Sequence, residues 1–147
     1  MNSDQSFNRY PAVFVHGLFG WGEGSGLEKS YHYWGFGGRE RDLLSHLRAQ
    51  GYEVYAPSCG PVSSAWDRVC ELWAMLVGGR VDYGKAHAER FGHARYGRVY
   101  PGLIPDWGEK GPHEKIDILG HSLGGAVAIL FSDLVAEGDE TERRVTP

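Results

Sequence analysis

Near its end, this chain has two apolar segments separated by a serine that lies between glycines. Together they restrict the fold more than any other feature. Residues 116–119 read Ile-Asp-Ile-Leu, a short run with β-branched residues that predicts a buried strand. The next five residues, Gly120-His121-Ser122-Leu123-Gly124, match Gly-x-Ser-x-Gly, and residues 126–135 form a strongly apolar helical segment. Strand, tight turn and helix in this order are typical of a nucleophile elbow.

The glycines of this motif have a steric purpose. Gly120 and Gly124 leave room for a close approach of strand and helix, and the turn exposes the hydroxyl of Ser122 above the sheet. The helix N-terminus would then lie beneath this serine, where its N–H groups and dipole favour negative charge. The alternative is a serine that only caps a helix, which serine does well. The complete pattern favours the nucleophile.

Composition and charge exclude several classes of protein. The chain has 147 residues, of which 41% are hydrophobic, so it is long enough for one folded domain with a core. A formal net charge of -4 gives no reason to expect a nucleic acid partner. No apolar run approaches the ~20 residues of a membrane span, so we expect no transmembrane segment. Residues 1–10 are polar and contain no apolar signal-peptide segment.

The remaining elements predict alternating strands and helices. We expect strands at residues 12–15 and 52–56, and helices at residues 40–50 and from Ser63 or Ser64 to Val77. Together with the elbow, this order predicts three parallel strands with flanking helices, the first strand lying between the other two. Four residues recur at helical spacing in the second helix and are expected in the core: Trp66, Val69, Trp73 and Leu76.

The segments between these elements are expected to be irregular. We expect a glycine- and aromatic-rich loop over residues 22–38, which holds Tyr31, Tyr33, Trp34 and Phe36. Residues 81–97 are expected to be a polar, aromatic-bearing region, and residues 101–110 a loop. We divide the chain into a flexible lead at 1–10, a domain at 11–138 and a charged, disordered tail at 139–147.

The first predicted strand runs into His16-Gly17-Leu18. In α/β-hydrolases the loop after such a strand supplies one main-chain donor of the oxyanion hole, and the residue after the nucleophile supplies the other. The two candidates here are the backbone N–H groups of Leu18 and Leu123. We interpret His16 as a structural histidine at the strand end, because this chemistry uses main-chain donors.

The chain resembles the staphylococcal and thermoalkalophilic bacterial lipases over roughly residues 10–135. The resemblance extends well beyond the elbow, and its segments follow the family's order. These segments are His16-Gly17, Gly20-Trp21-Gly22, Tyr33-Trp34-Gly35, Gly60-Pro61-Val62-Ser63-Ser64, Trp66-Asp67-Arg68, Cys70-Glu71, Gly78-Gly79, Val81-Asp82-Tyr83-Gly84, Ala86-His87-Ala88, Gly92-His93-Ala94-Arg95-Tyr96-Gly97 and Tyr100-Pro101-Gly102-Leu103.

The resemblance implies an α/β-hydrolase fold and hydrolysis of triacylglycerols and other carboxylic esters. It implies Ser122 as the nucleophile, with Leu18 and Leu123 as the oxyanion hole, a lipid ester as substrate and an extracellular location. It also implies a structural zinc site whose ligands carry over to Asp67, His87 and His93, with a fourth ligand, an Asp, later in the family's chain. Two histidines and a carboxylate suit zinc, whereas two solvated loop histidines are the alternative.

The sequence departs from the family in ways that bear on activity. The family usually has Phe at the position of Leu18 and Gln at that of Leu123, although both act through the backbone. No histidine follows Ser122, whereas in this fold the triad runs Ser, Asp or Glu, then His. We therefore expect a partial α/β-hydrolase fold lacking its C-terminal half, with the triad acid and base and the family's calcium site outside this chain.

Two functional hypotheses remain. The first is a lipase-type ester hydrolase segment, inactive or nearly so by itself. The second is an inactive lipase-like fragment that binds zinc or a partner through Asp67, His87 and His93. In either case the last strand of the sheet has an exposed edge, so we expect marginal stability or self-association.

Overall fold

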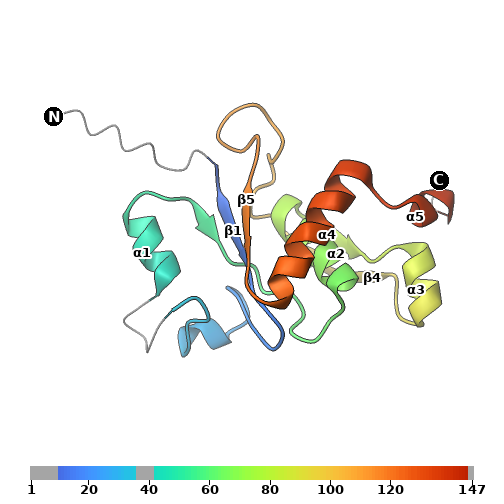
Figure 1. Ribbon diagram of the computed structural model, residues 1–147, viewed down its shortest axis with the longest axis horizontal. Coiled ribbons are helices and arrows are strands. Elements are labelled where there is room, and N and C mark those ends of the chain that lie inside the picture. The colour runs from blue at the N-terminus through green and yellow to red at the C-terminus, as the bar shows by residue number, and fades with distance from the viewer. Residues whose placement is uncertain (1–9, 36–41, 146–147) are drawn as a thin grey trace.

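The computed structural model describes residues 10–35 and 42–145. Its elements are arranged in a row, from α1 at one end to α3 and α5 at the other, with the central sheet between them (Figure 1). In chain order they are β1 (Ala12–Val15), a 3-10 turn (Leu27–Lys29), α1 (Leu43–Ala49), β2 (Val54–Tyr55), α2 (Ala65–Val77), β3 (Gly79–Asp82), α3 (Lys85–Phe91), β4 (Tyr96–Tyr100), β5 (Asp117–Gly120), α4 (Leu123–Glu137) and α5 (Glu140–Val145).

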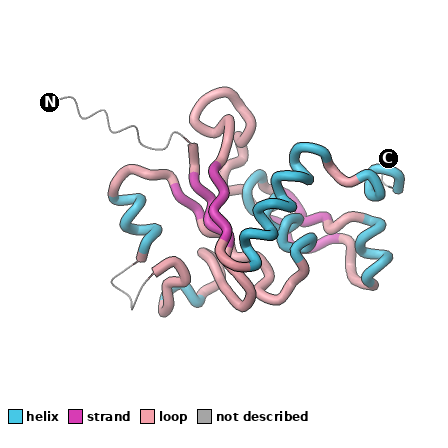
Figure 2. Tube along the Cα trace, viewed as in Figure 1, coloured by secondary structure: helices cyan, strands magenta, loops and turns pink. Residues whose placement is uncertain are grey.

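The central sheet has three parallel strands in the order β2-β1-β5 (Figure 2). The predicted parallel sheet with the first strand in the middle is therefore confirmed. Val13 and Val15 of β1 pack in a core with α2 and α4, whereas Phe14 packs in a second core with α1. This alternation follows from the twofold repeat of a strand, and it explains why the central strand is apolar on both faces.

Helix α2 begins and ends where the sequence indicates. The Ser64 side chain accepts a hydrogen bond from the Asp67 N–H at 3.1 Å, and the helix ends at Gly78 with a φ of 88°. Val69 and Leu76 are buried as predicted, but Trp73 is 46% exposed. Its ring lies at the rim of the core against Trp107 and Phe131, with ring centroids 5.6 and 6.4 Å away.

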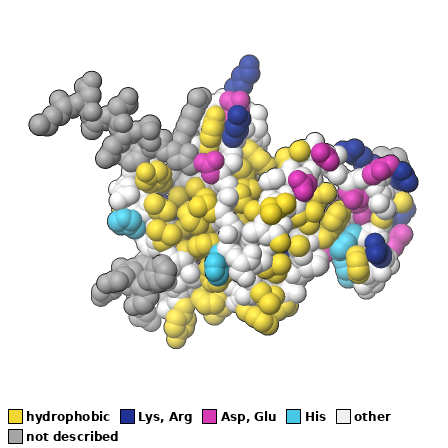
Figure 3. Space-filling model, viewed as in Figure 1, with side chains coloured by type: hydrophobic (Ala, Val, Ile, Leu, Met, Phe, Trp, Pro, Cys, Tyr) yellow, Lys and Arg dark blue, Asp and Glu magenta, His cyan; other side chains and the backbone are white. Residues whose placement is uncertain are grey.

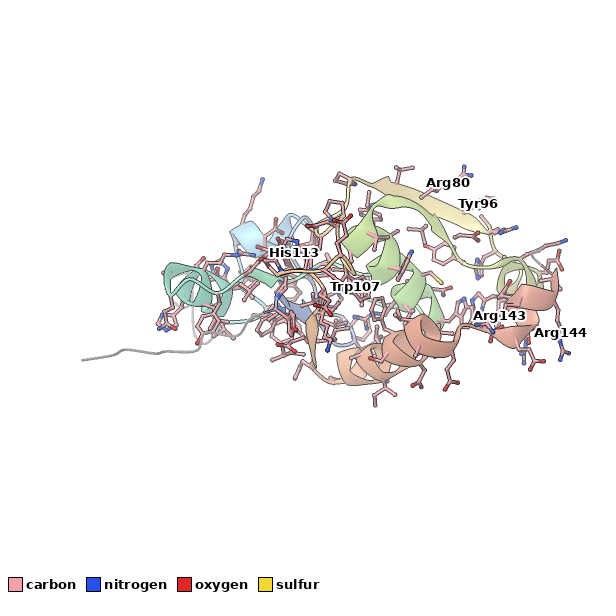
Figure 4. All side chains as sticks on the ribbon, turned by 90° about the horizontal axis from the view of Figure 1, so that it is seen from above. Arg80, Tyr96, Trp107, His113, Arg143 and Arg144 are labelled. Atoms are coloured by element: carbon pink, nitrogen blue, oxygen red, sulfur yellow. The ribbon has the colours of Figure 1, made fainter. Side chains whose placement is uncertain are left out.

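Residues 79–100 form regular structure that the sequence analysis did not predict. Strands β3 and β4 make an antiparallel hairpin, with Gly79 opposite Tyr100, and α3 lies between them in the chain. Both strands are mostly exposed, and the Arg80 guanidinium lies 4.1 Å from the centre of the Tyr96 ring (Figure 4). Because neither strand has a continuous apolar face, their residues show little sign of pairing in the sequence.

The charged tail differs from its predicted disorder over residues 140–145, which form α5. The Glu142 carboxylate of this helix accepts hydrogen bonds from the N–H groups of Ala86 and His87, at 3.1 and 2.7 Å. These are first-turn N–H groups of α3 that have no partner within that helix. Tertiary contact therefore orders a segment in which every residue but Val145 is polar. Residues 1–9 of the lead predicted at 1–10, and Phe36, lie outside the described residues.

On the face shown in Figure 3, charged and hydrophobic side chains are concentrated over different elements. Acidic and basic side chains gather over α3 and α5, whereas hydrophobic side chains dominate the face over the central sheet and α4. None of the described helices is long and apolar enough to span a membrane.

A charged cluster of one histidine and two carboxylates holds the loop between β4 and β5. His113 Nδ1 lies 2.8 Å from the Asp106 carboxylate, and His113 Nε2 lies 3.1 Å from that of Glu53 (Figure 4). Both carboxylates raise the pKa of His113 above its ordinary 6.5, the hydrogen bond to Asp106 contributing most. The same hydrogen bond lowers the pKa of Asp106.

The raised pKa of His113 determines how the stability of the fold changes with pH. A raised histidine pKa stabilises the fold fully below the ordinary value of 6.5, and this contribution disappears as pH rises through the raised value. We expect an NMR titration of the His113 ring to give a midpoint above 6.5. We also expect amide exchange at Gly108, which donates to His113 O, to accelerate above that midpoint after correction for intrinsic rates. His113→Gln should remove the pH dependence, and an unshifted midpoint would contradict the assignment.

Candidate active site and metal centre

Ser122 stands at a sharp bend between β5 and α4. It is exposed, and its backbone has a φ of 55° and a ψ of −124°, a conformation that residues other than glycine rarely adopt. Strain of this kind persists only where the surrounding structure enforces it, and it is often found at functional sites. The helix below is 15 residues long and begins directly after the serine, so its N-terminal N–H groups face this position.

Close packing between the elbow and β1 explains the glycines of the motif. A Cβ added at Gly124 would collide with the carbonyl oxygen of Val15, and one added at Gly120 would collide with the carbonyl of Gly124. The His121 N–H donates to Val15 O at 3.0 Å, so the parallel pairing of β1 and β5 continues to the edge of the elbow. The end of β1 and the start of α4 are thereby held together.

This packing predicts opposite effects for two adjacent glycines. Gly124→Ala forces its methyl group into the Val15 carbonyl, so we expect it to lower the free energy of unfolding by about 1–3 kcal/mol. A Cβ at Gly125 would meet only the Gly120 carbonyl, at 4.0 Å, and alanine is the better helix former. Gly125→Ala should therefore raise the free energy of unfolding by about 0.5–1 kcal/mol. Urea unfolding measures both, and equal effects would contradict this geometry.

The loop after β1 lies against the serine. A Cβ added at Gly17 would be 2.9 Å from the Ser122 Cβ. The backbone N–H of Leu18 follows in this loop, and the N–H of Leu123 follows the serine itself. Within the described residues, neither N–H has a hydrogen-bond acceptor. The structure thus brings the predicted residues Leu18, Ser122 and Leu123 to one end of the sheet.

His16 is buried in the interior, as expected of a structural residue. Its Nε2 lies 3.1 Å from the Cys59 carbonyl and its Nδ1 lies 3.0 Å from Arg68 Nη2. Burial lowers the pKa of His16, so the ring is neutral at pH 7. Nδ1 also lies 2.9 Å from the Gly17 carbonyl, so the ring nitrogens face two carbonyl oxygens, which only accept, and the Arg68 guanidinium, which only donates.

Two residues that the sequence analysis quoted without assigning a role contact this loop. The Tyr33 hydroxyl accepts a hydrogen bond from the Gly17 N–H at 2.8 Å and lies 2.6 Å from Nδ1 of His121. Arg68 Nη2 donates to the carbonyl of His16. Tyr33 lies in an irregular loop and Arg68 on a helix. No spacing in the sequence indicates that either one meets the elbow.

The serine hydroxyl has no histidine partner among the described residues. The neighbouring ring of His121 is engaged with Tyr33, and His16 is buried below the loop. The described residues therefore supply no histidine base for the Ser122 hydroxyl.

Asp67, His87 and His93 converge at the other end of the molecule. Asp67 Oδ1 lies 3.0 Å from His87 Nε2 and 3.7 Å from His93 Nε2, and one donor atom from each residue lies within 4.8 Å of the others. Asp67 is in the first turn of α2, His87 is on α3 and His93 follows α3. The fold thus brings together all three residues predicted as metal ligands.

Neighbouring groups orient these donors toward one another. The Ser64 hydroxyl donates to Asp67 Oδ2 at 2.8 Å, which leaves Oδ1 facing the histidines. His93 Nδ1 donates to the Ala94 carbonyl at 2.9 Å, so Nε2 is the free ligand atom. The His87 ring stacks on Trp66 with centroids 5.2 Å apart. Such supporting contacts are typical of metal-binding histidines.

Comparison with known proteins gives the family. Residues 8–145 match the family described as "Lipase-like, C-terminal domain", and the chain belongs to this family. Lipase 2 of Staphylococcus aureus is 40% identical over 141 residues, which cover 96% of this chain and 20% of that protein. The lipase of Staphylococcus hyicus is likewise 40% identical over 141 residues, covering 96% and 21%. These relatives confirm the resemblance to staphylococcal lipases, and the chain spans about a fifth of their length.

Three solved structures have folds similar to that of this chain. Lipase 1 from Pelosinus fermentans superposes with a TM-score of 0.85 at 47% identity, covering 96% of this chain and 36% of that one. EstA from Clostridium botulinum gives 0.83 at 45% identity, covering 95% and 31%. The Staphylococcus hyicus lipase gives 0.85 at 40% identity, covering 99% and 36%.

Proposed function

We propose that this chain is the nucleophile-bearing part of a lipase-type carboxylic ester hydrolase. Ser122 is the acyl-accepting nucleophile, and the N–H groups of Leu18 and Leu123 hold the oxyanion. The observation that carries the proposal is the combination of a strained, exposed serine with two main-chain N–H groups that lack acceptors among the described residues. Membership of a lipase family supports the same reading.

The proposed reaction follows the general scheme of serine hydrolases. The Ser122 oxygen attacks the ester carbonyl carbon while a base takes its proton, and the two N–H groups bind the carbonyl oxygen as it becomes negative. The alcohol leaves, and water then releases the carboxylic acid. The described residues supply the nucleophile and the oxyanion donors, and the base comes from elsewhere. Without a base, only a residual rate remains.

Apolar side chains beside the serine favour a lipid ester as substrate. Leu18, Phe19 and Val62 are 52%, 71% and 67% exposed. Leu18 and Phe19 continue the loop that packs against Ser122, and the Phe19 N–H donates to Pro61 O, next to Val62. Exposed apolar residues grouped in this way are typical of a surface that binds an apolar ligand. An acyl chain is the ligand that the proposed chemistry requires.

The proposed reaction belongs with a partial α/β-hydrolase fold. The three parallel strands, the helices on both faces and the strand–elbow–helix unit support this assignment. Strand β5 pairs only with β1 among the described strands, so its other edge is available for a further strand or for self-association. The family resemblance also favours an extracellular protein.

Asp67, His87 and His93 fit a structural zinc site. Two imidazole nitrogens and one carboxylate oxygen suit zinc, and tetrahedral coordination leaves one position for a fourth ligand. Bound zinc would join the start of α2 to α3 and the turn after it. The cluster shares no residue with the elbow. A second candidate function is therefore an inactive, zinc- or partner-binding module, in which these residues serve without Ser122.

A chimera tests the proposed function directly. The segment of Staphylococcus hyicus lipase that matches this chain is replaced by the corresponding residues of this chain, and hydrolysis of p-nitrophenyl butyrate is measured. We expect activity that depends on Ser122. A folded chimera, verified by circular dichroism, that hydrolyses the ester no faster than buffer would contradict the ester hydrolase and favour the binding module.

A further inference from the structure

A buried cation lies directly below the loop that packs against Ser122. Arg68 is fully buried, and its Nη2 donates to the His16 carbonyl and lies 3.0 Å from His16 Nδ1. Its Nε and Nη1 atoms are also buried and have no hydrogen-bond partner within the described residues. No carboxylate oxygen of the described chain lies within 4.0 Å of this guanidinium.

The acidic residue one turn after Arg68 on the same helix is engaged elsewhere. Glu71, three residues after Arg68, accepts from the Gly60 N–H at 2.6 Å and from the Tyr83 hydroxyl at 3.2 Å. The Arg68 charge is thus buried without a direct counter-ion in the described residues. An unpaired buried charge is among the most destabilising groups in a protein, so its presence calls for a functional explanation.

Arg68 and Tyr33 hold the two ends of one peptide group. Arg68 donates to the carbonyl oxygen of the His16–Gly17 peptide, and the Tyr33 hydroxyl accepts from its N–H at 2.8 Å. The next N–H along the chain is that of Leu18. That N–H belongs to the Gly17–Leu18 peptide, whose carbonyl oxygen accepts from the Gly20 N–H at 3.1 Å and lies 2.9 Å from His16 Nδ1. Because this peptide is planar, a fixed Gly17 carbonyl also fixes the direction of the Leu18 N–H, and Arg68 holds the His16 ring and carbonyl beside it.

We propose that Arg68 is a positioning residue of the oxyanion hole, which aims the Leu18 N–H by holding His16 against the Gly17 carbonyl and places an unneutralised positive charge beneath the developing oxyanion. This inference rests on the proposed function. Charge that is fixed before the reaction, in a site shielded from water, stabilises an anionic transition state more than it stabilises the neutral ester. We therefore expect fast acylation of Ser122 to require the positive charge of Arg68 as well as its hydrogen bond.

The reaction to measure is acylation of Ser122 by p-nitrophenyl butyrate, with imidazole added as a soluble base. The bond between Ser122 Oγ and the acyl carbon forms, the bond to the aryl oxygen breaks, p-nitrophenolate leaves, and imidazole takes the serine proton. Mass spectrometry of the whole chain and of its peptides measures the rate of acyl incorporation at Ser122. Thermal unfolding of each variant is recorded alongside.

Three variants separate charge from structure. Arg68→Met removes the charge and keeps much of the side-chain volume, so we expect acylation at Ser122 to slow by roughly tenfold to a hundredfold. Arg68→Lys keeps the charge and should recover most of the rate that is lost in Arg68→Met. Arg80→Met removes an exposed arginine on β3, far along the chain from the elbow, and serves as the charge-matched control with an unchanged rate.

The outcomes distinguish the inference from the proposed function. Slow acylation in Arg68→Met, with its unfolding temperature near that of the unmodified chain and with recovery in Arg68→Lys, supports the inference. Equal rates in Arg68→Met and the unmodified chain overturn it. Equally slow acylation in Arg68→Met and Arg68→Lys, with a parallel fall in unfolding temperature, overturns it in favour of a purely structural role. Absence of acylation at Ser122 in the unmodified chain overturns the proposed function itself.

Discussion

Replacing Ser122 by alanine should lower kcat/KM for ester hydrolysis by about 10^4–10^6 in the active chimera, the largest effect expected of any substitution in this chain. The hydroxyl oxygen is the atom that forms the acyl bond, and alanine supplies no substitute. Binding is expected to change little, because the oxyanion donors are main-chain groups and the apolar residues around the serine are unaltered. The loss should therefore appear in kcat, with KM nearly unchanged.

Ser132 provides a matched control for this substitution. It lies on the same helix, α4, and its hydroxyl donates to the Ala128 carbonyl one turn earlier. Ser132→Ala should leave kcat/KM unchanged. If Ser122→Ala retained more than about a hundredth of the rate, another group would be forming the acyl bond, and the nucleophile would have to be sought elsewhere.

Zinc is expected to produce the largest effect on stability. A ligand that binds only the folded state at 100 times its dissociation constant stabilises by about 2.7 kcal/mol. For a chain of this length, that corresponds to a rise in unfolding temperature of roughly 5–10 °C. Elemental analysis should find about one zinc per chain, and a chelator should reverse the rise in unfolding temperature.

Substitution of the ligands separates metal binding from helix capping. His87→Ala and His93→Ala should each abolish the zinc-dependent rise, whereas His46→Ala, on the surface of α1, should leave it intact. Asp67 also contributes to the start of α2 through Ser64, so Asp67→Asn is measured both with and without zinc. No bound zinc in the unmodified chain, or an unchanged response in His87→Ala, would contradict the metal assignment.

The central sheet and the elbow could be predicted because local signals agree with tertiary structure. The strand at 12–15 is a continuous apolar run, Ser64 and Gly78 mark the two ends of α2, and the glycines of the elbow record a close approach of backbones. Each of these sequence patterns involves residues that lie only a few positions apart in the chain. The metal cluster was found through a resemblance to a family, since His-x5-His alone is a weak pattern.

The features that the sequence did not predict depend on contacts between distant parts of the chain. Strands β3 and β4 stabilise each other although neither shows the alternation of a half-buried strand. Helix α5 caps α3 through Glu142, although every residue of α5 but Val145 is polar. The role of Arg68 arises from a peptide 52 residues earlier in the chain. No pattern of spacing in a single sequence encodes such meetings.

The most direct measurement is the site of acyl transfer. The chain is incubated with p-nitrophenyl butyrate in imidazole buffer, digested, and its peptides are mapped by mass spectrometry. The account predicts a butyryl group on Ser122, and no such group at this position in Ser122→Ala. An unmodified Ser122, with the acyl group spread over surface lysines and tyrosines equally in both proteins, would contradict it.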